Sequence, residues 1–216
     1  MDAGNYRHQL NSIIIFKQER ILIMAWLETK YKLTASAPLI QHNGQTADPT
    51  NRWSKAIKLI SSKRAKTDAD YEEMARLEFM AGLYLDENGP IVPAFMIDAL
   101  IVNGAKKSKE GQVAKSGCFC LQHARLEYDG PRTPDELWAD EVFHFAAIVR
   151  VQQSRVSRMR PIFHNWSAVV TLNIEDTMVN VARVDEWLTA AGTQVGIGDW
   201  RPQYGRFTVE RMNGKK

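Results

Sequence analysis

The sequence predicts an α+β fold in which helices pack on an antiparallel β-sheet. Strand-like and helix-like segments alternate near both ends of the chain, an order that is typical of α+β sandwiches. The composition is that of a globular protein, since 44% of the 216 residues are hydrophobic and 25% are charged. A chain of this length is expected to form one domain, or one domain with a large insertion.

Residues 1–23 are expected to be an extension ahead of this domain. Their apolar residues are interrupted by the polar segment 17–20, so the stretch is too short to span a membrane. Charges in its middle and the lack of a small-residue cleavage site also distinguish it from a signal peptide. We therefore expect the domain to occupy residues 24–212, with a short tail at 213–216.

The elements of the first half are predicted from the spacing of apolar residues and from turn residues. Alternation of apolar and polar positions is typical of strands, whereas an apolar stripe at every third or fourth position is typical of helices. Gly104 is expected to end its helix as the C-terminal cap. These patterns predict a strand at Trp26–Ile40, a basic helix at Asn51–Ser62, a second helix capped by Asp68 or Asp70, a hairpin with an Asn88-Gly89 turn and a helix at Ala94–Gly104.

The second half is predicted to contain mostly strands, with one amphipathic helix that stops at Gly192. A glycine-rich loop, Val195–Gly205, separates this helix from the last strand. The predicted elements are strands at Cys118–Tyr128, Glu141–Val151, Asn165–Ile174 and Arg206–Met212, and a helix at Val181–Ala191.

Basic residues are distributed unevenly, although the net charge is only +3. No acidic residue lies between Asp48 and Asp68, or between Glu141 and Glu175. Such segregation is what a surface that follows phosphates needs, while the alternative is solvated loops and lysines that favour a helix end. We expect nucleic-acid contacts from Lys106, Lys107, Lys109, Arg150, Arg155, Arg158 and Arg160.

The glycine-rich loop has two interpretations. Because it follows a helix rather than opening one, it does not match a dinucleotide or P-loop site, and no nucleotide cofactor is expected. It is either a turn that needs positive φ at Gly196 and Gly198, or a binding loop whose amides meet a phosphate while an aromatic ring stacks on a base. The binding interpretation uses the backbone of Gly196, Gly198 and Gly205 and the side chains of Trp200, Arg201, Tyr204 and Arg206.

Histidines and cysteines are the remaining candidates for chemistry. Cys118, Cys120 and His123 invite a metal interpretation, but the spacing is unusual for zinc and no fourth ligand is evident, so a buried strand face is expected instead. His42 is the best general base if the protein is catalytic, and otherwise a solvated loop residue. No familiar catalytic motif occurs, so we expect no catalytic residue, no metal and no cofactor. The two cysteines are too close for a disulfide, which fits a reducing, cytoplasmic environment.

Four short landmarks occur in a particular order along residues 24–212. They are Ser36-Ala37-Pro38-Leu39 at the end of the first strand, Ile91–Leu100 at a helix start, Gly196-Ile197-Gly198, and the closing segment Gly205–Val209. Their order resembles the RAMP superfamily of CRISPR-associated proteins, in particular the backbone subunits that coat guide RNA, or a phage-encoded relative of them.

The resemblance implies a ferredoxin-like, RNA-recognition-motif-like core. This core has an antiparallel sheet with helices on one face, and a projecting insertion is expected at about residues 106–164. Two departures affect function. Ala94-Phe95-Met96 replaces the Gly-Ser-Ser that the superfamily favours at the helix start. The segment 77–80, Leu-Glu-Phe-Met, lies where its nucleases carry a loop histidine or aspartate, so cleavage is not expected.

These observations together predict a non-catalytic subunit that binds single-stranded nucleic acid largely without sequence preference. RNA is favoured over DNA only by the resemblance, because stacking and phosphate contacts do not sense the 2′-hydroxyl. Its partners would be the strand and copies of itself or other subunits of a ribonucleoprotein or filament, with no membrane. Two alternatives are a RAMP-type endoribonuclease that uses His42 or a loop carboxylate, and a phage accessory protein that inhibits a host complex.

Overall fold

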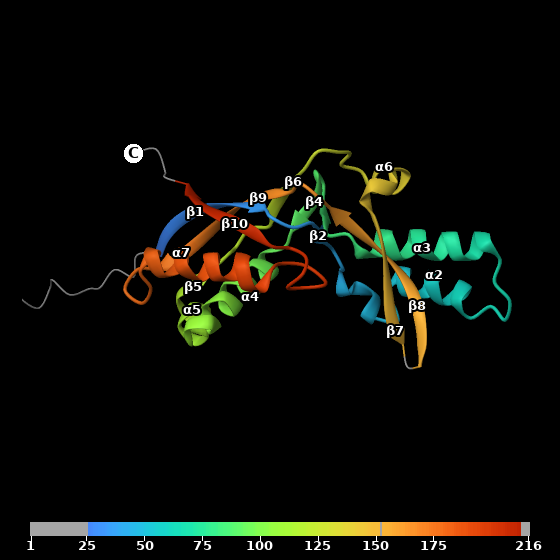
Figure 1. Cartoon of the computed structure of the whole chain (residues 1–216), viewed down its shortest axis with the longest axis horizontal. Helices are drawn as coiled ribbons and strands as arrows, with labels where there is room; N and C mark the ends of the chain where they lie inside the picture. The colour runs from blue at the N-terminus through green and yellow to red at the C-terminus, as the bar shows by residue number, and fades with distance from the viewer. Residues whose placement is uncertain (1–25, 152, 213–216) are drawn as a thin grey trace, which may run out of the picture.

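The computed structural model describes residues 26–151 and 153–212. A large sheet with its helices occupies one end of the long axis, and two helices with a long hairpin occupy the other (Figure 1). The expected extension 1–23 and tail 213–216 lie outside the described residues. Within the described part of the chain, no helix combines the length and the apolar character needed to cross a bilayer.

The fold is mixed α+β and its sheets are antiparallel, as the sequence predicts. The large sheet has the order β10-β1-β9-β6-β4-β3, with β5 also paired to β9, and the small sheet has the order β2-β8-β7. The strands are β1 (Trp26–Ala35), β2 (Leu39–Ile40), β3 (Leu85–Asp86), β4 (Gly89–Val92), β5 (Cys118–Phe119), β6 (Ala124–Glu127), β7 (His144–Val151), β8 (Ser154–Phe163), β9 (Ser167–Glu175) and β10 (Phe207–Met212). The helices are α2 (Arg52–Ser61), α3 (Asp68–Gly82), α4 (Ala94–Ala105), α5 (Gly111–Gly117), α6 (Pro134–Ala139) and α7 (Val181–Ala190).

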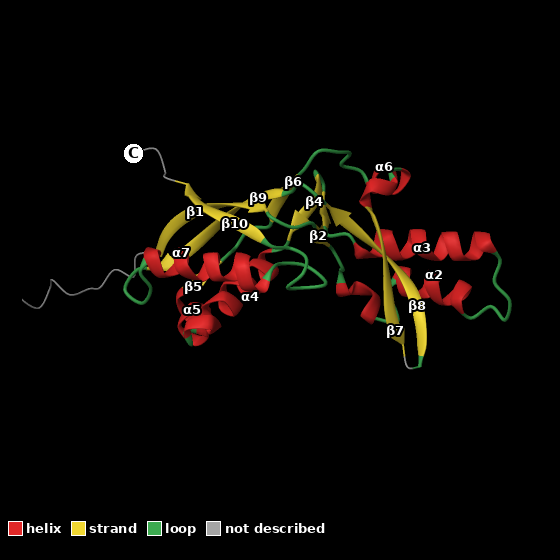
Figure 2. Ribbon diagram, in the orientation of Figure 1, coloured by secondary structure: helices red, strands yellow, loops and turns green. Residues whose placement is uncertain are grey.

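Helices cover one face of the large sheet and leave the other face open. Figure 2 shows α4, α5 and α7 on the same side of β1, β9 and β10. Along β1, Tyr31 and Leu33 are fully buried, whereas Lys30 and Lys32 are exposed. Because successive strand residues point to opposite faces, the predicted alternation places the apolar side chains under the helices and the lysines on the open face.

Gly104 allows α4 and α7 to approach each other closely. A Cβ atom at this position would lie 2.1 Å from the carbonyl oxygen of Trp187 and 3.0 Å from the Cβ of Ala191. The helix does not end here but continues to Ala105. The prediction that Gly104 is a C-terminal cap is therefore wrong, and the glycine serves helix packing instead.

The second part of the molecule combines segments that are distant in sequence. The α3 helix begins at a capping box formed by Thr67 and Asp70 and packs along β8. Figure 1 shows β7 and β8 as a hairpin that projects beside α2 and α3. The segment 106–164, where a projecting insertion is expected, contains both strands of this hairpin. It also contains β5 and β6, which belong to the large sheet.

Several predicted strands are interrupted in the structure. Trp26–Ile40 is two strands in different sheets, because the chain turns at Ser36 and Pro38 cannot donate a ladder hydrogen bond. Similarly, Cys118–Tyr128 is split into β5 and β6. The strand predicted at Glu141–Val151 begins only at His144, after a helical turn.

Candidate nucleic-acid interface

The glycine-rich loop adopts the backbone conformation that its glycines predict. Gly196, Gly198 and Gly205 have φ angles of 75°, 85° and 68°. The loop is closed by a hydrogen bond of 2.9 Å from the Ile197 amide to the Gly205 carbonyl. The Gly205 amide donates to the Pro38 carbonyl at 2.7 Å, which anchors the loop to the turn between β1 and β2. Positive φ at Gly196 and Gly198 is therefore confirmed, and two backbone hydrogen bonds close and anchor the loop.

Two aromatic side chains of this loop pack against the hairpin. The rings of Trp200 and Tyr204 contact Phe145 of β7 edge to face, with centroid distances of 5.8 Å and 5.3 Å. Trp200 remains 38% exposed, and its φ of 56° is uncommon for a residue other than glycine. The ring is therefore held by its edge contact while part of its surface faces solvent.

Two of the predicted clusters meet in one groove. Lys106 and Lys107, which follow α4, line a hollow of about 1040 Å³ together with Trp200 and Arg201. We call this hollow the loop groove. It brings two cations from one segment together with a cation and an exposed aromatic ring from another, although the segments are far apart in the sequence.

Three other predicted residues, Lys109, Tyr204 and Arg206, do not line the loop groove. Lys109 lines a neighbouring hollow that it shares with Lys106. Arg206 donates from its Nε to the Pro202 carbonyl at 2.7 Å, so it braces the loop. Tyr204 is partly buried against Phe145. The structure therefore gives Arg206 and Tyr204 supporting positions within the loop.

Glu110, the one acid among these lysines, is bound elsewhere. Its carboxylate accepts hydrogen bonds from Arg183 and from the indole of Trp187, both on α7, and from Ser108. These contacts, with the Arg183 hydrogen bond as the largest cause, lower the pKa of Glu110 from 4.5 to about 2. Its negative charge is therefore paired with α7 and does not neutralise Lys106, Lys107 or Lys109.

This network predicts a specific acid dependence of stability. Because the folded-state pKa of Glu110 lies below its ordinary value, its contribution is complete above pH 4.5 and is lost as the pH falls toward about 2. Urea unfolding of the wild type and of Glu110→Gln across this window should show a steeper loss of unfolding free energy in the wild type. Parallel curves for the two proteins would contradict this assignment.

The four arginines predicted on the hairpin do not form one surface. Arg150 and Arg155 face each other across the hairpin in register, and both are exposed. Arg158 instead forms an ion pair with the buried carboxylate of Glu78 on α3. The side chain of Arg160 is only 12% exposed and faces inward. Only the outer two arginines therefore fit the prediction of an exposed basic strand.

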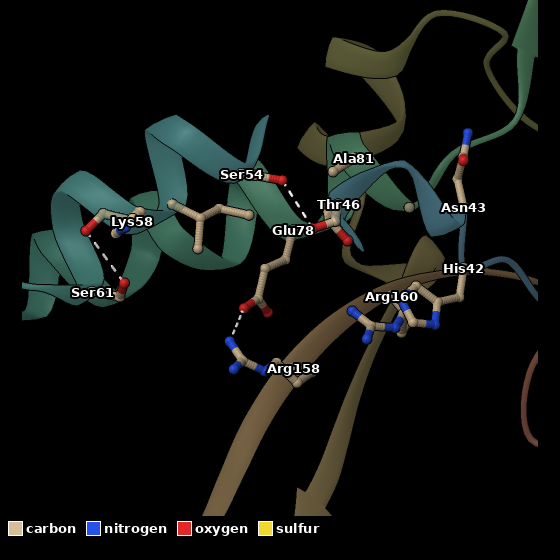
Figure 3. A pocket seen from close by; sticks show the side chains of 12 residues that line it. His42, Asn43, Thr46, Ser54, Lys58, Ser61, Glu78, Ala81, Arg158 and Arg160 are labelled. Carbon is tan, nitrogen blue, oxygen red and sulfur yellow. Dashed lines mark hydrogen bonds and ion pairs between the residues drawn. The ribbon is translucent and has the colours of Figure 1, made fainter. Parts of the chain in front are cut away.

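The inner two arginines line a second hollow, shown in Figure 3. It has a volume of about 320 Å³ and lies between the loop at His42, the helices α2 and α3, and β8. We call it the arginine pocket. Its ionisable lining residues are His42, Lys58, Glu78, Arg158 and Arg160.

Asp199 connects the arginine pocket with the loop groove. It lines the loop groove, and its Oδ2 lies 3.3 Å from Nδ1 of His42 and 3.8 Å from Nε of Arg160. The hydrogen bond from His42 is the largest cause of the lowered pKa of Asp199. Sequence analysis did not select Asp199 or Glu78 for the site, and the only local signal was the position of Asp199 inside the glycine-rich loop.

Cys118 and Cys120 are both buried, as expected, but only Cys118 belongs to a strand, because β5 ends at Phe119. Burial raises the pKa of the Cys118 thiol to about 12, which disfavours the thiolate that binds metals. His123 accepts a hydrogen bond at its Nδ1 from the Ala94 amide at 3.1 Å. Among the residues that the structure describes, no cluster of three or more metal-ligating side chains occurs.

No protein-family model matches the sequence, and comparison with curated proteins finds no significant match.

Proposed function

We propose that this protein binds single-stranded nucleic acid, with RNA favoured, as a non-catalytic subunit of a ribonucleoprotein or filament. The observation that carries this proposal is the loop groove, where Lys106, Lys107, Trp200 and Arg201 line one hollow. Cationic side chains grip phosphates of any sequence, and an exposed aromatic ring stacks on any base. Both kinds of contact are needed for a strand that is not paired, and the groove offers both.

The order of the elements supports the resemblance to RAMP proteins. The chain runs through β1, α4, β5 with β6, β9, α7 and β10, and the central strands lie in the order β10-β1-β9-β6. A β-α-β-β-α-β succession is the ferredoxin-like pattern. This supports a ferredoxin-like core whose binding elements are the glycine-rich loop and the projecting hairpin.

The open face of the large sheet is a rival surface for the strand. Trp26 packs edge to face on Phe119 at one end of this face, with ring centroids 4.7 Å apart. Lys30 and Lys32 are exposed on the same face of β1. A test of the proposed function must therefore separate the loop groove from this sheet face.

Salt dependence of strand binding distinguishes the two surfaces. Replacing Lys106, Lys107 and Arg201 by glutamine should lower the slope of log affinity against log salt by about 2, since each phosphate contact contributes about 0.7 for single strands. Fluorescence anisotropy with a labelled single-stranded RNA and DNA measures this slope. The charge-matched control replaces Lys30, Lys32 and Arg125, which are exposed on the sheet. A slope that falls only in the control would place the strand on the sheet face.

A second candidate function is cleavage of the bound strand. The observation that favours it is the pairing of His42 with Asp199, because a carboxylate that holds an imidazole is the usual support of a histidine base. Gel analysis of the strand after the same titration, with and without a divalent metal, separates the two functions. Intact strand at saturation supports the non-catalytic proposal, and fragments that disappear in His42→Ala support cleavage.

A further inference from the structure

The arginine pocket has a surplus of positive charge. Lys58, Arg158 and Arg160 line it, and two carboxylates oppose them, Glu78 in the lining and Asp199 beside it. Among the described residues, no ion pair involves Lys58. One cation of the pocket is therefore left for a partner that the chain itself does not supply.

Arg160 has donor capacity that the described residues do not use. Its Nε is buried and has no hydrogen-bond partner among them, since the Asp199 oxygen at 3.8 Å is beyond hydrogen-bond distance. One terminal nitrogen of the guanidinium donates to the Met159 carbonyl at 3.0 Å. Burial lowers the pKa of Arg160, which reflects the cost of holding this charge away from water. An oxyanion in the pocket would offset that cost.

The opposite wall of the pocket is fixed in place. Glu78 accepts from the Arg158 guanidinium and, at 3.0 Å, from the Met159 amide, so it joins α3 to β8. Asp199 holds the imidazole of His42 at 3.3 Å. These contacts hold Arg158 and His42 in place before any ligand arrives, so this wall of the pocket would require little ordering on binding.

We propose that the arginine pocket is a phosphate-binding site that takes one phosphate group of a nucleotide-sized ligand, with Arg160 and Lys58 as its cationic contacts. The fork of an arginine matches phosphate oxygens, and lysine adds a point charge. A volume of about 320 Å³ lies at the small end of ligand pockets, which span about 300–1,000 Å³. That size suits a phosphate with its sugar rather than a long chain.

Three sources could supply this phosphate: a free nucleotide, the terminal phosphate of a strand, or an internal phosphodiester. Asp199 lines the loop groove and contacts His42 and Arg160, which line the arginine pocket, so a strand bound in the groove is a neighbouring source of this phosphate. The inference rests on the proposed function only where a strand is the source. Binding of small phosphates does not require the loop groove, so it can be tested separately.

Isothermal titration calorimetry of the full chain with inorganic phosphate and with adenosine monophosphate tests the site. Arg160→Gln should weaken binding about tenfold or more, because it removes hydrogen bonds to a charged group. Lys58→Gln should weaken it by about two- to fivefold, as expected for a more exposed charge. Lys55→Gln is the matched control, since this exposed lysine lies on the same helix but does not line the pocket.

The outcomes are distinct even if one variant is unstable. Thermal melting checks the fold of Arg160→Gln, and Arg160→Lys serves as a milder replacement. No binding of either phosphate by the wild type would overturn the inference, whether or not strands bind. Equal losses in Lys58→Gln and Lys55→Gln would also overturn it, because they would indicate general surface attraction. If the wild type binds phosphate but does not bind strands, the proposed function is rejected and the phosphate site is retained.

The source is identified by comparing strands that differ only at one end. Tighter binding of a 5′- or 3′-phosphorylated oligonucleotide than of its hydroxyl-ended form, abolished by Arg160→Gln, assigns a terminal phosphate. If the phosphorylated and hydroxyl-ended oligonucleotides bind equally, and Arg160→Gln weakens both to the same extent, the phosphate in the pocket is an internal phosphodiester. If Arg160→Gln affects adenosine monophosphate but neither strand, the ligand is a free nucleotide.

Discussion

Replacing Trp200 by alanine is expected to weaken single-strand affinity by about 1–3 kcal/mol, the usual worth of one base stacked on an aromatic ring. The residue lines the loop groove and is 38% exposed, and its ring contacts Phe145 edge to face. A duplex, whose bases are already stacked, should lose much less affinity. Anisotropy titrations with a single strand and with the matching duplex measure both effects.

The control for this prediction is Tyr71→Ala, which removes an exposed aromatic ring on α3 that does not line the loop groove. Its strand affinity should stay unchanged. The competing view makes Trp200 a core residue, whose truncation would cost about 3–5 kcal/mol of unfolding free energy. Lost stability with unchanged affinity per folded molecule would reject stacking by Trp200.

Replacing Gly205 by alanine is expected to destabilise the protein more than any surface substitution discussed above. The added Cβ would lie 1.7 Å from the Ile197 carbonyl oxygen, and the φ of 68° would be strained. The strain costs about 1–2 kcal/mol for an L-residue, and overpacking adds about 1–3 kcal/mol. Because Gly205 closes the loop that carries Trp200, strand affinity should also fall.

Gly44→Ala is the matched control, since no atom lies within 4 Å of its added Cβ and its φ is not positive. Chemical unfolding of both variants should show a large loss of unfolding free energy for Gly205→Ala and little change for Gly44→Ala. If Gly205→Ala unfolds like the wild type, the loop is not closed by the contact between Ile197 and Gly205.

Local sequence patterns determined the elements and several of their details. Alternation in β1 predicted that Tyr31 and Leu33 are buried and that Lys30 and Lys32 are exposed. The turn residues around Asn88 and Gly89 predicted the hairpin of β3 and β4, although its two turn residues are Glu87 and Asn88 and Gly89 already pairs with Asp86 as the first residue of β4. These features depend on side chains and dihedral preferences of residues that are adjacent or one turn apart, so the sequence carries them directly.

Features that combine distant segments were predicted only in part or not at all. Both clusters of the loop groove were selected from their residue types, but nothing local indicated that Lys106 and Trp200 line the same hollow. Gly104 looked like a helix cap because glycine commonly ends helices. Its role depends on the carbonyl of Trp187, which belongs to another helix.

The division between Arg155 and Arg160 shows most directly what the sequence could not decide. Both belong to the same acid-free run, and a basic run indicates only that cations are available. By itself, the sequence determined the α+β class, the alternation in β1, the positive φ of Gly196 and Gly198 and a supply of segregated charge. The tertiary structure decided that Arg155 is exposed while the side chain of Arg160 is mostly covered, beside Asp199 and near Glu78. The physical reason is that burial and charge pairing depend on which segments pack against each other, and the chain brings α3, β8 and the glycine-rich loop together only when it folds.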